Sequence, residues 1–227
     1  MPARFVIATL LAALAAPVLA APPPVTVVEL FQSQGCSSCP PANANVNALI
    51  AARPDVLALS FAVTYWDQLG WKDGFATRAN TQRQWDYAKG LHHDNVWTPQ
   101  VVVNGRSDLV GANASALADA LKPLPTGAPA LALNDGTLAI GRGTAPRGGA
   151  DVWLVRYDPR TLNVAVKAGE NGGKTLPHRN IVRSLTRLGG WTGTPVNFGV
   201  PAATPGLATA ILLQSANGGP ILAATRS

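Results

Sequence analysis

Short apolar runs separated by proline and glycine mark the first half of the chain. Residues 25–31 (VTVVELF) and 56–63 (VLALSFAV) have the length and the β-branched content of buried strands. Between them, the apolar positions of residues 46–50 have helical spacing until Pro54 interrupts the pattern. A strand, a helix and a strand in this order predict two parallel neighbouring strands joined by a crossover helix.

The pattern then predicts two further helices and two further strands. A polar helix is expected from about residue 77 to 89. Residues 101–103 read as a third strand, with residues 106–111 as its hairpin partner, and a last helix begins near Asn113. The order of elements is therefore expected to be β, α, β, α, β, β, α.

The second half of the chain has a different pattern. Residues 122–130 (KPLPTGAPA) are rich in proline and glycine, as at a domain boundary. Beyond them, three stretches alternate apolar and polar positions around turns at residues 134–136, 158–159 and 217–219. Three such hairpins predict an all-β domain, an antiparallel sandwich, over residues 129–227.

The first twenty residues, MPARFVIATLLAALAAPVLA, place Arg4 before a short apolar run that ends in small residues. This arrangement is typical of a secretory signal peptide, residues 1–20, cleaved after Ala20. No later stretch reaches about 18 uninterrupted apolar residues, so we expect no transmembrane segment in the mature chain. The sequence thus predicts a periplasmic or secreted protein, in a compartment where disulfides form and persist.

Charge is distributed unevenly along the 227 residues, whose formal net charge is +6. Residues 129–227 hold 10 basic and 4 acidic side chains, whereas residues 21–128 hold 7 and 8. The basic residues of the second half are scattered singly, which favours a solvated surface over a nucleic-acid site. Weak attraction to an anionic membrane surface is the alternative, and nucleic acid is not an expected partner.

The only two cysteines, Cys36 and Cys39, lie three positions apart between the first predicted strand and the first predicted helix. A helix N-terminus presents unpaired N–H groups and a positive dipole end, which stabilise a thiolate. Cys36, the outer sulfur, is therefore the expected attacking thiol. Cys39, one helical turn further on, is the expected resolving thiol. This chemistry needs no cofactor and no metal.

Thr98 and Pro99, immediately before the third predicted strand, lead to a family resemblance. With the Cys36–Cys39 pair, they resemble the thioredoxin superfamily, in which a cis-proline faces the Cys-x-x-Cys loop. The resemblance implies a thioredoxin-like α/β fold for residues 21–128, with Pro99 as the cis-proline. It also implies that the Thr98 backbone pairs with an extended substrate peptide.

A closer resemblance covers nearly all of the mature chain. The strings ELFQSQGCSSCPPA, YWDQLGWKD, RQWDYA, TPQVVVNG and GENGGKTLPHRNIVRSL together resemble a family of exported bacterial thioredoxin-like proteins defined only as a domain of unknown function (DUF 1223). This family resemblance implies the fold and brings no activity with it.

The sequence therefore predicts a thiol-disulfide oxidoreductase whose partners are protein thiols or disulfides and a redox partner of unknown identity. Ser37 and Ser38 separate the two cysteines and add no cationic group beside Cys36. Reduction potentials of such pairs run from about −270 to about −120 mV. Without a neighbouring cation, a reductase or isomerase is favoured over a strong oxidase.

Other interpretations of the cysteine pair stay open. A static disulfide that closes so short a loop would contribute little stability. Structural zinc needs two more ligands, and His92, His93 and His178 are the only histidines. The main alternative is a non-catalytic binding module or a copper-handling protein, because thiolates bind Cu(I) and His92-His93 precedes Thr98-Pro99.

Aromatic residues follow the second predicted strand, at the sheet edge where the cysteines are expected. Trp66, Asp67 and Trp71 are the predicted substrate-binding residues, with Asp67 as a candidate proton acceptor for Cys39. Packing of the two rings over the sheet is the alternative.

Residues 168–175 (AGENGGKT) resemble a phosphate-binding loop in composition. Ala168 stands where that motif requires glycine, and Pro177 interrupts the helix that would have to follow. The sequence therefore favours a glycine-rich turn between two strands.

Overall fold

The computed structural model describes residues 25–227, so the predicted signal peptide, residues 1–20, lies outside the described part. Thirteen strands and three helices occur within these residues. No helix in this part of the chain is both long enough and apolar enough to cross a membrane.

The first half of the chain has the element order that the sequence predicts. Its elements are β1 (Thr26–Gln32), α1 (Cys39–Ala52), β2 (Val56–Ala62), α2 (Arg78–Gly90), β3 (Gln100–Val103), β4 (Ser107–Leu109) and α3 (Ala114–Ala120). Strands β1 and β2 are parallel, with Thr26 opposite Val56, and β3 pairs with β1 in the antiparallel direction.

The second half consists of strands alone. They are β5 (Leu131–Asn134), β6 (Thr137–Ile140), β7 (Ala150–Asp158), β8 (Leu162–Ala165), β9 (Thr175–His178), β10 (Ile181–Trp191), β11 (Val196–Gly199), β12 (Ala208–Ser215) and β13 (Ile221–Arg226). Strands β5, β6 and β11 form a small three-stranded sheet, and β8 and β9 form a separate two-stranded sheet.

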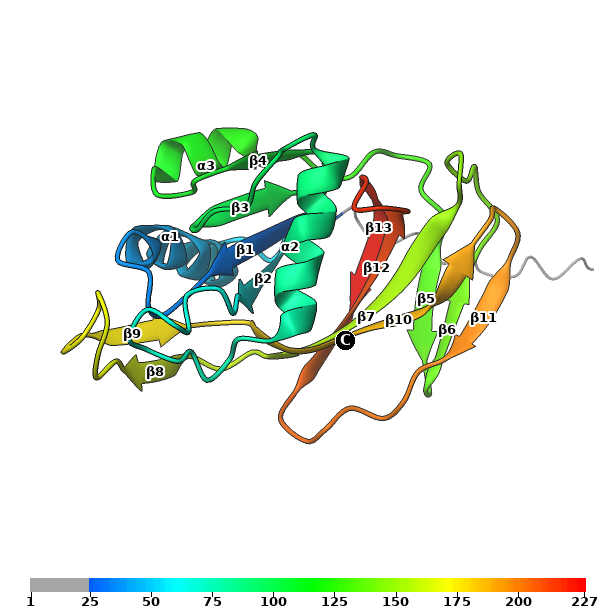
Figure 1. Ribbon diagram of the computed structural model, residues 1–227. Helices are drawn as coiled ribbons and strands as arrows, with labels where there is room; N and C mark the ends of the chain where they lie inside the picture. The colour runs from blue at the N-terminus through cyan, green and yellow to red at the C-terminus, as the bar shows by residue number, and fades with distance from the viewer. Residues whose placement is uncertain (1–24) are drawn as a thin grey trace, which may run out of the picture.

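One mixed sheet of eight strands runs through both halves of the chain, in the order β13-β12-β7-β10-β2-β1-β3-β4 (Figure 1). The junction is between β2 and β10, where Ser60 and Ile181 pair in the parallel direction. Beside it, the Ser60 N–H donates to the Asn180 carbonyl at 3.0 Å, and Asn180 Nδ2 donates to the Ala58 carbonyl at 2.7 Å.

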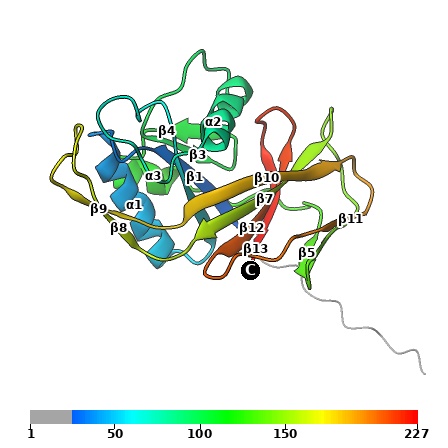
Figure 2. The ribbon, with the colours of Figure 1, turned by 60° about the horizontal axis from the view of Figure 1, so that its bottom comes forward.

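The predicted fold class, a thioredoxin-like α/β domain followed by an all-β antiparallel sandwich domain, is therefore wrong. All seven residues of β2 are buried, so the backbone groups on its outer edge need partners that water cannot supply. Asn180 and β10 supply those partners, and β7, β12 and β13 extend the same sheet. The two halves thus share one sheet, as the long strands β7 and β10 show in Figure 2.

Two of the three predicted hairpins of the second half are confirmed. Strands β5 and β6 pair across residues 135–136, and β12 and β13 pair across residues 216–220. The hairpin predicted at residues 158–159 is wrong, because β7 pairs with β10 and β12 and not with β8.

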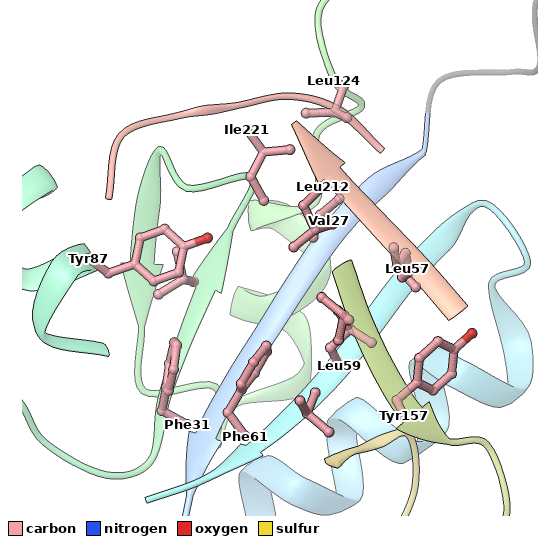
Figure 3. Close-up of a cluster of buried hydrophobic side chains, with 14 of the residues drawn as sticks. Val27, Phe31, Leu57, Leu59, Phe61, Tyr87, Leu124, Tyr157, Leu212 and Ile221 are labelled. Atoms are coloured by element: carbon pink, nitrogen blue, oxygen red, sulfur yellow. The ribbon is translucent and has the colours of Figure 1, made fainter. Parts of the chain in front are cut away.

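A single apolar cluster joins residues from both halves on the α2 face of the sheet (Figure 3). Phe31 and Phe61 stack at its base with their ring centroids 5.2 Å apart. Leu57 and Leu59 of β2 belong to the same cluster as Tyr157 of β7. The opposite face of β1 and β2 packs against α1 and α3 in a second cluster.

Helix α2 approaches the β12–β13 turn at backbone distance. A Cβ atom added to Gly218 would collide with the carbonyl group of Asp86, and Gly218 has a positive φ of 71°. We expect Gly218→Ala to lower the free energy of unfolding by more than the roughly 1–2 kcal/mol of left-handed strain alone. Gly206→Ala is the matched control, because Gly206 has a φ of 83° and open space around it. Urea unfolding of both variants measures the difference, and equal losses would contradict the close approach.

Candidate functional site

The two cysteines are joined by a disulfide at the start of α1. They belong to the cysteine loop, residues 33–39, which connects β1 to that helix. The Cys36 N–H donates to the Ser33 carbonyl and the Cys39 N–H donates to the Cys36 carbonyl, both at 3.2 Å. These two turns place both sulfurs at the helix N-terminus, as the sequence predicts.

The Thr98–Pro99 peptide lies across from the cysteines and is cis, as the family resemblance implies. Ser38 Oγ is 3.3 Å from Cys36 Sγ and donates to the Thr98 carbonyl at 3.4 Å. On the other side, Trp66 Nε1 donates to Thr98 Oγ1 at 2.7 Å. The structure thus brings together the cysteine pair, the cis peptide and one of the predicted substrate-binding residues.

The segment of residues 64–76, here called the aromatic loop, is bound to the cysteine loop through Gln34. Trp71 Nε1 donates to Gln34 Oε1 at 2.9 Å, and the Gln34 N–H donates to Asp73 Oδ2 at 2.9 Å. Burial raises the pKa of the Asp73 carboxyl. The hydrogen bonds that the carboxyl accepts from backbone N–H groups lower its pKa and offset part of this effect. Asp67 Oδ1 accepts a hydrogen bond from the Asp73 N–H at 3.1 Å, so the Asp67 carboxylate binds within the aromatic loop and not to Cys39.

A third segment contacts the cysteine loop and was not among the predicted site residues. Residues 168–174, here called the cover, connect β8 to β9, which confirms the predicted glycine-rich turn between two strands. Asn171 Nδ2 donates to the carbonyl of Gln34 at 3.0 Å and to that of Cys36 at 2.8 Å. Its Oδ1 accepts a hydrogen bond from Lys174 Nζ at 2.9 Å.

Glu170 of the cover contacts Ser37, the first of the two residues between the cysteines. Its Oε2 accepts the Ser37 N–H at 2.9 Å, and hydrogen bonding with Ser37 lowers the pKa of the Glu170 carboxyl. The carboxylate therefore accepts a hydrogen bond from a backbone N–H group on the outer face of the disulfide loop. The only signal in the sequence was a pair of polar side chains within a glycine-rich stretch.

Both cysteines are closed off from solvent in this conformation. Cys36 is 0% exposed and Cys39 is 2% exposed, whereas Ser37 and Ser38 between them are exposed. The expected outer position of the Cys36 sulfur is thus not what the structure shows. An external thiol reaches that sulfur only after a neighbouring segment moves.

A buried polar pair lies one helical turn beyond Cys39, on the same buried face of α1. Asn43 Nδ2 donates to the Pro177 carbonyl at 2.8 Å and lies 3.1 Å from His178 Nδ1. Because the amide nitrogen of Asn43 is the donor, His178 Nδ1 is the acceptor and the ring proton is on Nε2. Burial lowers the pKa of His178 to about 4.

The other two histidines lie in the loop after α2. His93 Nε2 is 3.1 Å from Asp108 Oδ1, and its ring meets Trp97 edge-on. His92 is exposed and has a positive φ of 63°. Among residues 25–227, no three His, Cys, Asp or Glu side chains form a group that could hold a metal ion.

The fold and the site together define a protein with a mixed β-sheet and a Cys-x-x-Cys disulfide at the N-terminus of its first helix. The chain belongs to the family described as "Protein of unknown function (DUF1223)", whose model matches residues 27–214. Of the closer resemblance inferred from the sequence, membership of DUF 1223 is thereby confirmed. A comparison with curated proteins found no match.

Two solved structures are similar to this chain. Protein AGR_C_4864 from Agrobacterium tumefaciens is 32% identical, with a TM-score of 0.75 over 91% of this chain and 95% of its own. HBP35 of Porphyromonas gingivalis is 13% identical, with a TM-score of 0.57 over 90% of this chain and 75% of its own. The second similarity concerns the fold alone.

Proposed function

We propose that the Cys36–Cys39 disulfide is a redox-active pair that exchanges with thiols and disulfides of other proteins. The observation that carries the proposal is its placement at the N-terminus of α1, opposite the cis Thr98–Pro99 peptide. A helix N-terminus stabilises a thiolate. The Ser38 hydroxyl lies 3.3 Å from Cys36 Sγ and can donate to a thiolate there once its single proton turns away from the Thr98 carbonyl.

The exchange follows from the two sulfurs alone. In the reducing direction, the Cys36 thiolate attacks one sulfur of a substrate disulfide, and that S–S bond breaks as a Cys36–substrate bond forms. The released substrate thiolate takes up a proton. Cys39, having lost its proton, then attacks the Cys36 sulfur, which forms the Cys36–Cys39 bond and releases the second substrate thiol. The substrate gains two electrons, and a dithiol partner returns two electrons to the pair.

The charges around the cysteine loop favour a reductase or isomerase over a strong oxidase. A strong oxidant needs a reduced form that is stabilised, usually through a cation beside the attacking thiolate. Here the Glu170 carboxylate binds the Ser37 N–H and the Asp73 carboxyl binds the Gln34 N–H, whereas the Lys174 ammonium binds Asn171 of the cover. A negative charge at this place disfavours a thiolate at Cys36, so the reduced pair gives up its electrons more readily.

The proposed setting is the periplasm or the extracellular space, where exported proteins carry disulfides. The proposed substrate face combines the Thr98 backbone with the aromatic loop, where Trp66 and Trp71 are half-buried and Leu69 is 55% exposed. An extended peptide could place apolar side chains on these three residues while its disulfide faces Cys36.

A structural disulfide is the second candidate, and the burial of both sulfurs favours it. A loop of about four residues contributes about 2 kcal/mol in the chain-entropy description. Unfolding of the oxidised and the reduced protein in urea measures that contribution. The rate of thiol-disulfide exchange does not depend on the difference in unfolding free energy between the oxidised and the reduced protein, so the two measurements are independent.

Insulin reduction tests the proposed exchange. We expect the wild-type protein to accelerate insulin reduction by dithiothreitol and Cys36→Ser to abolish the acceleration, because no sulfur then attacks the substrate. Cys39→Ser should accumulate mixed disulfides with exported proteins, seen on non-reducing gels, and the double variant is the control without adducts. The proposal is contradicted if the wild-type protein does not accelerate insulin reduction and Cys39→Ser forms no mixed disulfides. The structural disulfide is then the remaining candidate.

A further inference from the structure

We propose that the cover, residues 168–174, is a movable segment that closes the Cys36–Cys39 disulfide, and that Asn171 holds it in the closed position. The inference rests on the proposed function, since it names what controls access to the same pair. Figures 1 and 2 both show the β8–β9 hairpin beside α1, the helix that begins at Cys39.

The burial of Asn171 is the first observation. Residues 167–175 are exposed with the single exception of Asn171, which is 0% exposed. Its side chain therefore points out of the cover and into the cysteine loop. There it donates to the carbonyls of Gln34 and Cys36. A buried amide with both N–H groups on one target loop acts as an anchor between the two segments.

The fit of the cover against the aromatic loop is the second observation. A Cβ atom added to Gly169 would lie 3.2 Å from the Trp71 Cβ and 3.5 Å from the Leu69 carbonyl oxygen. The cover therefore contacts both the aromatic loop and the cysteine loop, with Glu170 on the Ser37 N–H. A substrate peptide that lies along Leu69 and Trp71 therefore borders on the cover.

The freedom of the cover to move follows from the sheet to which its strands belong. Strands β8 and β9 pair only with each other, apart from the eight-stranded sheet. An isolated two-stranded hairpin has little stability of its own. The base of the hairpin is bound to α1, where Asn43 and Asn47 donate to the Pro177 carbonyl at 2.8 and 2.9 Å. The tip is bound to the cysteine loop mainly by side-chain hydrogen bonds of Asn171 and Glu170, which can break while the base stays in place.

Reduction of the oxidised full-length chain by dithiothreitol under native conditions tests the cover. Aliquots are quenched with iodoacetamide, and the alkylated fraction is followed by mass spectrometry. We expect Asn171→Ala to be reduced at least about tenfold faster than the wild type, because two hydrogen bonds of the closed position are lost. Asn163→Ala is the matched control: Asn163 lies on β8 of the same hairpin and is exposed, and its variant should be reduced at the wild-type rate.

A second variant and a stability measurement separate opening of the cover from general destabilisation. Glu170→Ala removes an exposed side chain, leaves the fold intact and should also accelerate reduction, by a smaller factor. Urea unfolding of each variant gives its global stability, and the acceleration should exceed the change that global unfolding explains. Equal reduction rates for the wild type, Asn171→Ala and Glu170→Ala would overturn the proposal that the cover controls access to the disulfide.

The two proposals fail in different ways. Faster dithiothreitol reduction of Asn171→Ala in a protein that never reduces insulin supports the cover and overturns the exchange function. Insulin reduction by a wild type whose disulfide is reduced as fast as that of Asn171→Ala supports the function and overturns the cover. Faster insulin reduction by Asn171→Ala than by the wild type supports both.

Discussion

Replacing Arg83 with methionine is expected to lower the free energy of unfolding by about 3–5 kcal/mol, because it leaves the Glu29 carboxylate buried without its partner. Glu29 is 0% exposed and Arg83 is 4% exposed. Arg83 Nε donates to Glu29 Oε1 at 2.6 Å, and Arg83 Nη2 donates to Glu29 Oε2 at 3.0 Å. The Tyr87 hydroxyl completes the environment of the carboxylate.

The guanidinium of Arg83 also joins the two halves of the chain. Its Nη1 donates to Gln214 Oε1 of β12 at 3.2 Å. Its central carbon lies over the rings of Phe61, Tyr87 and Trp153, at 5.6, 5.1 and 5.6 Å from their centroids. The loss of Arg83 therefore removes packing as well as charge.

A double-mutant cycle measures how much of this loss is the unpaired charge. Glu29→Leu combined with Arg83→Met should recover much of the stability lost by Arg83→Met alone, since no charge then remains buried. Arg53→Met is the control, because the Arg53–Asp55 pair is 44% and 49% exposed and should contribute little. Equal unfolding midpoints in urea for Arg83→Met and Arg53→Met would contradict a buried ion pair.

Acidification is expected to destabilise the wild-type protein through His178 by about 3 kcal/mol between about pH 6.5 and pH 4. The folded protein holds the pKa of His178 at about 4 through burial, below the ordinary value of 6.5. The unfolded chain therefore binds a proton first as the pH falls. The contribution of His178 is fully present above about pH 6.5 and is gone below about pH 4.

His178→Gln isolates this effect, because glutamine can still accept the Asn43 hydrogen bond and does not titrate. Asp73, whose pKa burial raises, is present in both proteins and cancels in the comparison. Urea unfolding of both proteins from pH 7.5 to pH 4 gives the difference in stability as a function of pH. A pH-independent difference would contradict the buried neutral imidazole.

Local patterns were sufficient to predict the part of the site that depends on neighbours in the sequence. Cys36 and Cys39 were placed at a helix N-terminus from the strand before them and the helical spacing after them. Thr98-Pro99 was placed opposite them through the family resemblance. Both depend on short segments whose geometry the side chains themselves restrict.

The missing parts depend on contacts between distant residues. Alternation shows which face of a strand is buried but not which strand pairs with it, so β10 was placed in a separate sandwich and not beside β2. Asn171 lies 135 positions after Cys36, within a stretch of glycine and charged residues. Nothing local distinguishes it from Asn163, which is exposed on the same hairpin.

The contact between Asn171 and the cysteine loop has a consequence for the synthesis of the chain. The cysteines leave the ribosome about 135 residues ahead of Asn171. Both thiols are therefore open to oxidants while the chain is still incomplete. The buried position of the two sulfurs requires residues that are added late, so resistance to external thiols marks a finished molecule.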